Sequence, residues 1–303
     1  MYDATRGHYG ADVAPWLALA TLYGLSYLRQ GVGRWRPRAR GWVIVGASLL
    51  LLLVAVVWHL FRGYSPLALD PPHWEITEHD RLARHFIAQI PPEASLSAQG
   101  KLYPHLSNRI IVYQLPVVND AEYVFVDVSP PNLLHPYDLR TVVQDILRSG
   151  EFGVLDAADG YLLLRRGLNP STLPDAFYDF VRAPFAQPQY PLNVEFGDEL
   201  RLLGFDLVDD ARRQETSIRL YWQALRSIDH DLRLYPFFVN AKGEVIEDTN
   251  ERPLITQLWY PPRQWQPGEI VVEGYSAARM PKSSATSPSW PINFKVGLLG
   301  LSV

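Results

Sequence analysis

The chain has 303 residues, of which 48% are hydrophobic and 20% are charged, and its formal net charge is −4. This composition excludes a disordered chain, and the mildly acidic balance argues against binding to nucleic acid, which requires a concentrated basic face. The absence of cysteine excludes disulfides, thiolate nucleophiles and Cys-ligated zinc, while the length allows two domains with ordinary cores.

Two apolar segments near the N-terminus predict transmembrane helices. Residues 41–61, GWVIVGASLLLLLVAVVWHLF, contain no Asp, Glu, Lys or Arg. A helix of this length covers about 30 Å, the thickness of a hydrocarbon core. A buried soluble helix of this length usually has a polar face, and the following residues RGYSP do not form a signal-peptide cleavage site. Residues 13–28, VAPWLALATLYGLSYL, are also uncharged and predict a second span at the lower length limit.

The segment between these two spans predicts the orientation in the membrane. It contains five arginines and no acidic residue: Arg29, Arg34, Arg36, Arg38 and Arg40. The positive-inside rule places this loop in the cytoplasm, so the bulk of the chain is expected outside it. Residues 1–66 are therefore predicted to form a two-pass anchor in the cell membrane. A fragment of a larger polytopic membrane protein would have the same appearance.

Residues 67–188 predict a small extracytoplasmic three-layer α/β domain. Leu82, Phe86 and Ile90 recur at helical spacing after Thr77, a good N-cap, and Pro91 stops this helix. The other elements expected from apolar spacing are strands at 95–98, 109–115 and 123–128, a helix at 139–147, and a hairpin formed by 152–156 and 161–165.

Polar side chains near the predicted strand ends are the candidate binding residues of this domain: Ser97, Gln99, His105, Asn108 and Asp127. Ligands of α/β folds bind at such ends. However, no glycine-rich nucleotide motif follows a strand, so a nucleotide cofactor is not predicted. The favoured alternative is that Ser97, Gln99 and Asn108 satisfy backbone groups of the loops and that His105 packs under its loop. A hydrolase built on Asp127 and His105 lacks a recognisable nucleophile.

Residues 189–303 predict an antiparallel β-sandwich after a linker at residues 185–191. Short apolar strands alternate with charged or Pro/Gly-rich turns in this region. The expected strands are LRLLGFDLV, SIRLYWQAL, LRLYPFFVNA, EIVVEGYSA and INFKVGLLG. Together with the two spans and the α/β domain, this gives a membrane-anchored α+β protein.

Four aromatic residues of the predicted sandwich raise the question of sugar binding. Trp222 alternates with Leu220 on a strand and is expected in the core. Trp259, Tyr260 and Trp265 lie in a Pro-rich stretch, where exposed rings can stack on sugars. The favoured alternative is packing in the core for Trp259 and Tyr260, and for Trp265 the pinning of the turn before Pro267 and Gly268. Acidic clusters at 229–231 and 244–251 lack the spacing of a calcium loop, so no metal is predicted.

The segment HFIAQIPPEASLSAQGKLYPHLSNRIIVYQLP, followed by AEYVFVDV, resembles the extracytoplasmic part of an uncharacterised polytopic membrane family, domain of unknown function 2079. The resemblance covers about residues 7–166. That family is similar to membrane glycosyltransferases of the GT-C type, which use lipid-phosphate sugar donors. Their catalytic acid lies in an early external loop, so the resemblance implies no catalytic residue in this chain.

The C-terminal region resembles β-sandwich modules attached to membrane glycosyltransferase-like proteins, through FGDELRLLGFDL, IRLYWQAL, NERPL, WQPGEIVVEGY and FKVGLLG. The two resemblances predict a non-catalytic, membrane-anchored part of a GT-C-like system. Its expected partners are the lipid bilayer, a glycan or lipid-linked sugar, and a polytopic membrane protein. The alternative is a self-sufficient binding or scaffold protein of the cell envelope that has no role with glycans.

Overall fold

The computed structural model of the chain describes residues 14–35, 38, 40–63, 67–69, 76–130, 134–169, 172–210, 215–240, 242–248, 253–279 and 292–300. The chain forms two compact units, Met1–Glu75 and Ile76–Val303. Each unit has its own architecture.

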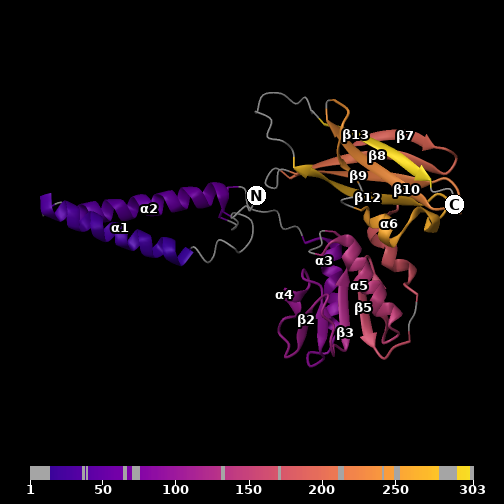
Figure 1. Cartoon of the computed structure of the whole chain (residues 1–303), viewed down its shortest axis with the longest axis horizontal. Coiled ribbons are helices and arrows are strands. Elements are labelled where there is room, and N and C mark those ends of the chain that lie inside the picture. Colours follow the sequence, from indigo (N-terminus) through magenta and orange to yellow (C-terminus); the bar gives the residue numbers. More distant parts are fainter. Residues whose placement is uncertain are drawn as a thin grey trace. The chain divides into compact units, whose positions relative to one another are not determined.

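The first unit contains two helices, α1 (Ala14–Trp35) and α2 (Arg40–Arg62), which lie side by side (Figure 1). Within α2, Gly41–Phe61 has a mean hydropathy of 2.6, and none of its most apolar stretch is buried. The side chains of the LLLLL run in the middle of α2 are all exposed. A helix that is long, uncharged and uncovered by protein is suited to a lipid environment.

The sequence predicts two membrane spans, but the structure supports only the one formed by α2. Among the described residues, Gly41–Phe61 is the one helix that is long and apolar enough to cross a membrane. α1 forms a helix of 22 residues, but Arg29 and Arg34 lie in its C-terminal part. Its uncharged portion, residues 14–28, covers only about 22 Å at the helical rise per residue.

The second unit begins with an α/β part built on a five-stranded sheet with the order β2-β1-β3-β5-β4. β1 pairs in parallel with β2 on one side and with the central strand β3 on the other, whereas β5 is antiparallel to β3 and β4. The strands are β1 (Leu96–Ala98), β2 (Val112–Gln114), β3 (Tyr123–Asp127), β4 (Phe152–Ala158) and β5 (Tyr161–Arg166). β3 is buried along its whole length, as an inner strand with two covered faces requires.

Helices cover both faces of this sheet and give three layers. α3 (Glu78–Ala88) packs Phe86 against alternate residues of β1, β3 and β5, including Phe125. α5 (Pro136–Arg148) packs Leu139 and Val143 against the opposite face of β3 and β5. Thr77 begins α3 as a complete capping box, and a short helix α4 (Tyr103–Leu106) connects β1 to β2.

The remainder of the second unit, the β part, contains two antiparallel sheets, which confirms the α+β class. The larger sheet has the order β6-β12-β9-β8-β7 and the smaller one β11-β10-β13. Their bounds are β6 (Arg182–Ala183), β7 (Tyr190–Phe196), β8 (Leu200–Asp210), β9 (Glu215–Ala224), β10 (Leu232–Asn240), β11 (Val245–Asp248), β12 (Ile270–Arg279) and β13 (Ile292–Gly300). Residues of both sheets, including Trp222 and Leu234, share one hydrophobic core. β7 begins inside the segment that the sequence predicts as a linker.

The α/β part and the β part meet through three short elements. The 3-10 helix η3 (Asp175–Val181) leads directly into β6, and α6 (Ile255–Trp259) is followed by the 3-10 helix η4 (Pro262–Gln264). α6 contacts α5 of the α/β part and β12 of the β part, and Figure 1 shows it at this junction. The core of the α/β part therefore includes side chains that lie nearly a hundred residues further along the chain.

Candidate functional site

Charged and hydroxyl side chains gather where β1 and β3 end. β1 is followed along the chain by β2 on one side, while β3 lies on its other side. In α/β sheets, ligands bind outside the carboxyl ends of strands at such a position. The β4–β5 turn and the first turn of α3 reach the same edge of the sheet. We call the resulting group the polar centre; it consists of His79, Lys101, Asp127, Ser129 and Asp159.

Asp127 is the most deeply buried member of the polar centre, with a side chain that is 4% exposed. Its Oδ2 lies 2.7 Å from Lys101 Nζ and 3.1 Å from His79 Nε2. Its Oδ1 accepts hydrogen bonds from the Ser129 amide at 2.9 Å and the Ser129 hydroxyl at 2.6 Å. Burial would raise the pKa of Asp127, but these positive charges and donors outweigh it and lower the pKa. The carboxylate is therefore ionised and fully surrounded.

His79 connects α3 to the edge of the sheet. Its Nδ1 lies 2.7 Å from Asp159 Oδ2, and its ring stacks on Tyr161 with centroids 4.3 Å apart. Burial alone would lower the pKa of His79, but hydrogen bonds and attraction to Asp127 and Asp159 raise it to about 9. The imidazole is therefore protonated at neutral pH, and it donates a hydrogen bond to a carboxylate on each side.

The polar centre contains a series with the spacing of a Ser-His-Asp triad. Ser129 Oγ lies 3.0 Å from His79 Nε2, and His79 Nδ1 lies 2.7 Å from Asp159. In such a triad the serine gives its proton to a neutral imidazole, and backbone N–H groups stabilise the oxyanion that forms. A working triad therefore needs a neutral histidine and backbone N–H donors in addition to these distances.

Three features distinguish this series from a working triad. The imidazolium of His79 cannot accept a proton from Ser129, because the pKa of His79 is about 9. The Ser129 hydroxyl donates to Asp127 instead. Pro130 follows Ser129 and has no N–H to offer an oxyanion. The arrangement is an ion network of two cations and two carboxylates that attaches the start of α3 to the sheet.

No metal site accompanies this network. Across the part of the chain that the structure describes, no group of three or more His, Cys, Asp or Glu side chains could hold a metal ion. Lys101 occupies the position beside Asp127 that a cation would need, and its ammonium also contacts the Ser129 carbonyl oxygen.

The structure brings together some of the sequence-predicted residues and separates others. The buried Gln99 side chain accepts a hydrogen bond from the Asp127 amide at 2.8 Å, and Ser97 Oγ donates to the Val117 carbonyl, so both satisfy backbone groups. His105 and Asn108 are exposed, and no described contact joins either of them to the polar centre. The expectation that His105 packs under its loop is wrong, because α4 directs its other face, with Leu106, toward the core.

The candidate sugar-stacking rings of the β part are not exposed, and the packing alternative describes them instead. Trp259 is 7% exposed, and Tyr260 and Trp265 are each 2% exposed. Trp259 packs its edge against Phe177 in the core of the α/β part, while Trp265 donates its indole N–H to the Tyr260 carbonyl. The Pro-rich stretch folds into α6 and η4, which place these rings inward. Trp222 is fully buried, as predicted.

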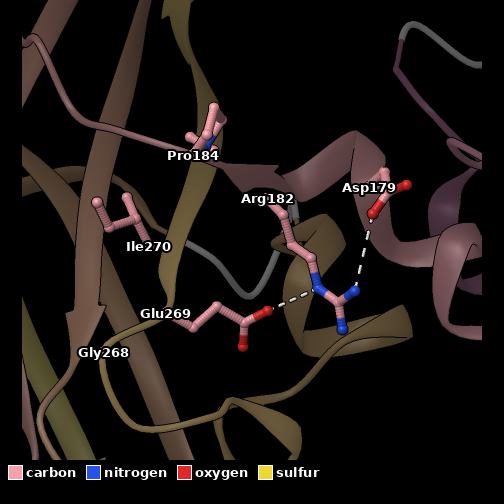
Figure 2. Close-up of a pocket in the computed structure, with 7 residues that line it drawn as sticks. Asp179, Arg182, Pro184, Gly268, Glu269 and Ile270 are labelled. Atoms are coloured by element: carbon pink, nitrogen blue, oxygen red, sulfur yellow. Dashed lines mark ion pairs between the residues drawn. The ribbon is translucent and has the colours of Figure 1, made fainter.

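A second charged cluster lies where η3 and β6 meet β12. Arg182 Nε lies 2.6 Å from Glu269 Oε1, and its two terminal nitrogens bind both carboxylate oxygens of Asp175. Asp179 Oδ1 lies 3.7 Å from Arg182 Nη1, across the guanidinium from Glu269 (Figure 2). Asp179, Arg182 and Glu269 border an open cavity of about 600 Å³. Because Arg182 is bound on all sides, including by the Tyr260 hydroxyl at 2.8 Å, the cluster is a joint between the two parts.

The sequence patterns do not identify four members of the polar centre: His79, Lys101, Ser129 and Asp159. Each lies in a turn or a helix start, in which polar residues are ordinary. The one available signal is position, because all four are next to elements whose ends meet at the carboxyl edge of β1 and β3. That signal becomes useful only when the strand order is known.

Comparison with known proteins gives one match. A family model described as "Predicted membrane protein (DUF2079)" matches residues 2–163, more than half of the chain. No curated protein and no solved structure matches.

Proposed function

The chain belongs to the DUF2079 family of predicted membrane proteins, and from this premise we propose that it is a membrane-anchored, non-catalytic part of a GT-C-like glycosyltransferase system. In this proposal α2 spans the bilayer, and the α/β part and the β part, the latter a β-sandwich module, lie outside the cytoplasm. The observation that carries it is α2, a helix of 23 residues whose apolar side chains are uncovered. The link to glycosyltransferases rests on sequence resemblance.

The orientation follows from charge. Arg29, Arg34 and Arg38 precede α2, and the positive-inside rule keeps such a cluster in the cytoplasm. Residues that follow α2 are then on the opposite side. This orientation requires α2 alone as a span, whether or not α1 also crosses the bilayer.

Structural support is the role that the two charged clusters favour within this proposal. The charged side chains of the polar centre pair with one another, as Lys101 does with Asp127. Arg182 likewise pairs with carboxylates of the same chain, including Glu269. The inward position of Trp259, Tyr260 and Trp265 removes the aromatic surface that direct sugar stacking would use. The same burial favours the second candidate, a scaffold protein of the cell envelope without a glycan role.

The orientation can be tested by labelling single cysteines, because the natural chain has none. Tyr137 is 47% exposed on α5, and Gln30 is exposed near the end of α1. In intact cells, a membrane-impermeant maleimide should label Tyr137→Cys at once and Gln30→Cys only after permeabilisation. The reverse pattern would overturn the proposed topology.

The role with glycans requires a binding experiment on the full chain in nanodiscs. One arm presents a glycan array, and the other presents vesicles with or without a polyprenyl-phosphate-linked sugar. Structural support predicts no binding in either arm. Saturable binding that depends on the sugar would replace support with direct glycan contact.

A further inference from the structure

Glu273 is an ionisable side chain in the middle of the hydrophobic interior. It lies on β12, is 1% exposed, and pairs in register with Leu220 of β9. Its Oε2 accepts the Thr256 amide at 3.0 Å and a short hydrogen bond from the Thr256 hydroxyl. The Ile255 amide is a further donor, and its hydrogen bond lowers the pKa of Glu273. The groups of α6 and β9 that face it, Thr256, Ile255 and Leu220, are uncharged. β6 and η3 also pack against β12, and their charged groups, Arg182, Asp175 and Asp179, pair with one another and with Glu269.

The groups bound by Glu273 belong to α6, which connects three regions of the second unit. Thr256 attaches α6 to β12 through Glu273, and Gln257 Nε2 donates to the Leu234 carbonyl of β10 at 2.8 Å. On its other side, α6 inserts Ile255, Leu258 and Trp259 into the core of the α/β part. Whatever weakens the Glu273–Thr256 contact therefore acts on the junction of the two parts.

We propose that α6 is a proton-controlled clasp between the α/β part and the β part, closed when Glu273 is neutral and loosened when Glu273 is ionised. A neutral carboxyl can remain in an apolar interior with its two donors from Thr256. An ionised carboxylate without a cation there is costly, and opening of α6 gives it access to water.

The balance between these two states falls close to neutral pH. Burial raises the pKa of Glu273 to about 7, although the donors of Thr256 and Ile255 oppose this effect. A domain outside the cytoplasm experiences the pH of its surroundings, so the clasp would respond to external acidity. This response does not depend on the proposed role with glycans.

The two parts remain attached when α6 opens. Arg182 of β6 stays bound to Asp175 of η3 and to Glu269 beside β12, and none of these contacts involves Glu273. The Arg182 cluster thus acts as the hinge, and the change is confined to α6 and the rings that it inserts. Figure 2 shows Arg182 and Glu269 of this hinge among the residues that line the open cavity.

Hydrogen exchange of α6 in the full chain tests the proposal. With Glu273 ionising at about 7 when α6 is closed and at 4.5 when it is open, the opening equilibrium should rise about 30-fold between pH 5.5 and pH 8.5. This change is measured by mass spectrometry after correction for the intrinsic pH dependence of exchange. In Glu273→Gln, which keeps the size and an acceptor oxygen, the corrected exchange should be independent of pH.

Two further variants complete the test. Thr256→Val removes a donor that favours the ionised form, so it should make the dependence on pH steeper than in the natural chain. Glu122→Gln, a change at an exposed residue of the α/β part, should leave the pH dependence of α6 exchange unchanged. The proposal is overturned if the natural chain shows no pH-dependent opening of α6. It is equally overturned if Glu273→Gln or, should that variant not fold, Thr256→Val retains the natural response.

Discussion

Asp127 and Glu273 are both carboxyl groups buried in the second unit, with 3% and 1% of each residue exposed. Burial raises the pKa of each, because an apolar environment disfavours the charged form. Around Asp127, two cations and the Ser129 hydroxyl reverse this effect, and the pKa falls. Around Glu273, only the uncharged donors of Thr256 and Ile255 are present, and the pKa rises to about 7.

This difference teaches that a buried carboxyl group is defined by its partners. Asp127 belongs to a closed ion network that should be insensitive to pH near neutrality. Its stabilising effect is lost only when acid protonates it, below its ordinary range. The pKa of Glu273 is shifted by no ionic partner, so its protonation is expected to change near neutral pH.

The largest expected effect comes from removing Asp127. Asp127→Ala leaves the charges of Lys101 and His79 without their shared carboxylate, and breaking a buried ion pair costs about 3–5 kcal/mol of unfolding free energy. Denaturant unfolding of the full chain measures this loss. Asp145→Ala, which breaks an exposed pair with Arg148, should cost less than about 1 kcal/mol. Equal costs for the two variants would mean that the network is solvated.

The next effect is the pH dependence that Glu273 imposes on stability. The unfolded carboxyl ionises near pH 4.5 and the folded one near pH 7, so unfolding releases a proton between these values. Stability should therefore fall as pH rises through this range, by about 3 kcal/mol, and then show no further loss from Glu273. Glu273→Gln should remove this slope and leave the Asp127 network intact. A slope that persists in this variant would assign the effect to other groups.

A smaller effect at higher pH should belong to His79, whose side chain is 24% exposed. Its pKa is raised from 6.5 to about 9, so its contribution to stability is complete below pH 6.5 and is lost as pH rises through about 9. His79→Gln should lower stability at pH 6 and flatten the profile between pH 6.5 and pH 9. Thermal unfolding across this range, with His105→Gln as an exposed control, provides the measurement.

The smallest effect concerns Ser129. Ser129→Ala removes one hydrogen bond to the ionised Asp127. A hydrogen bond to a charged group contributes about 1.5–3 kcal/mol to stability. The loss should be smaller here, because Lys101 and His79 still bind Asp127. The natural chain should not react with a fluorophosphonate probe, because His79 is protonated and no amide follows Ser129 toward an oxyanion. Labelling that disappears in Ser129→Ala would show a working nucleophile and end the non-catalytic proposal.

Local patterns were sufficient to predict many elements. The apolar run of α2 lies within an uninterrupted helix, Thr77 caps α3, and the apolar spacing predicts β3, α5 and the β4–β5 hairpin close to their bounds. These features depend on neighbours within a few residues, and hydrophobic periodicity or capping chemistry records them directly. The alternation of Leu220 and Trp222 likewise indicates the buried face of β9.

Only the tertiary structure decided the sites. In the sequence, four members of the polar centre are ordinary polar residues of turns and helix starts: His79, Lys101, Ser129 and Asp159. The strand order β2-β1-β3-β5-β4 brings them together at one edge of the sheet. Trp259 belongs to a Pro-rich stretch whose side chains turn inward because α6 completes the core of a sheet built from residues far earlier in the chain. Glu273 resembles any outward acid of an alternating strand, and only the fold shows that its face of β12, shared with Val271 and in register with Leu220, is the buried one. Sequence periodicity records which faces of an element are apolar, whereas burial and charge pairing depend on contacts between distant segments.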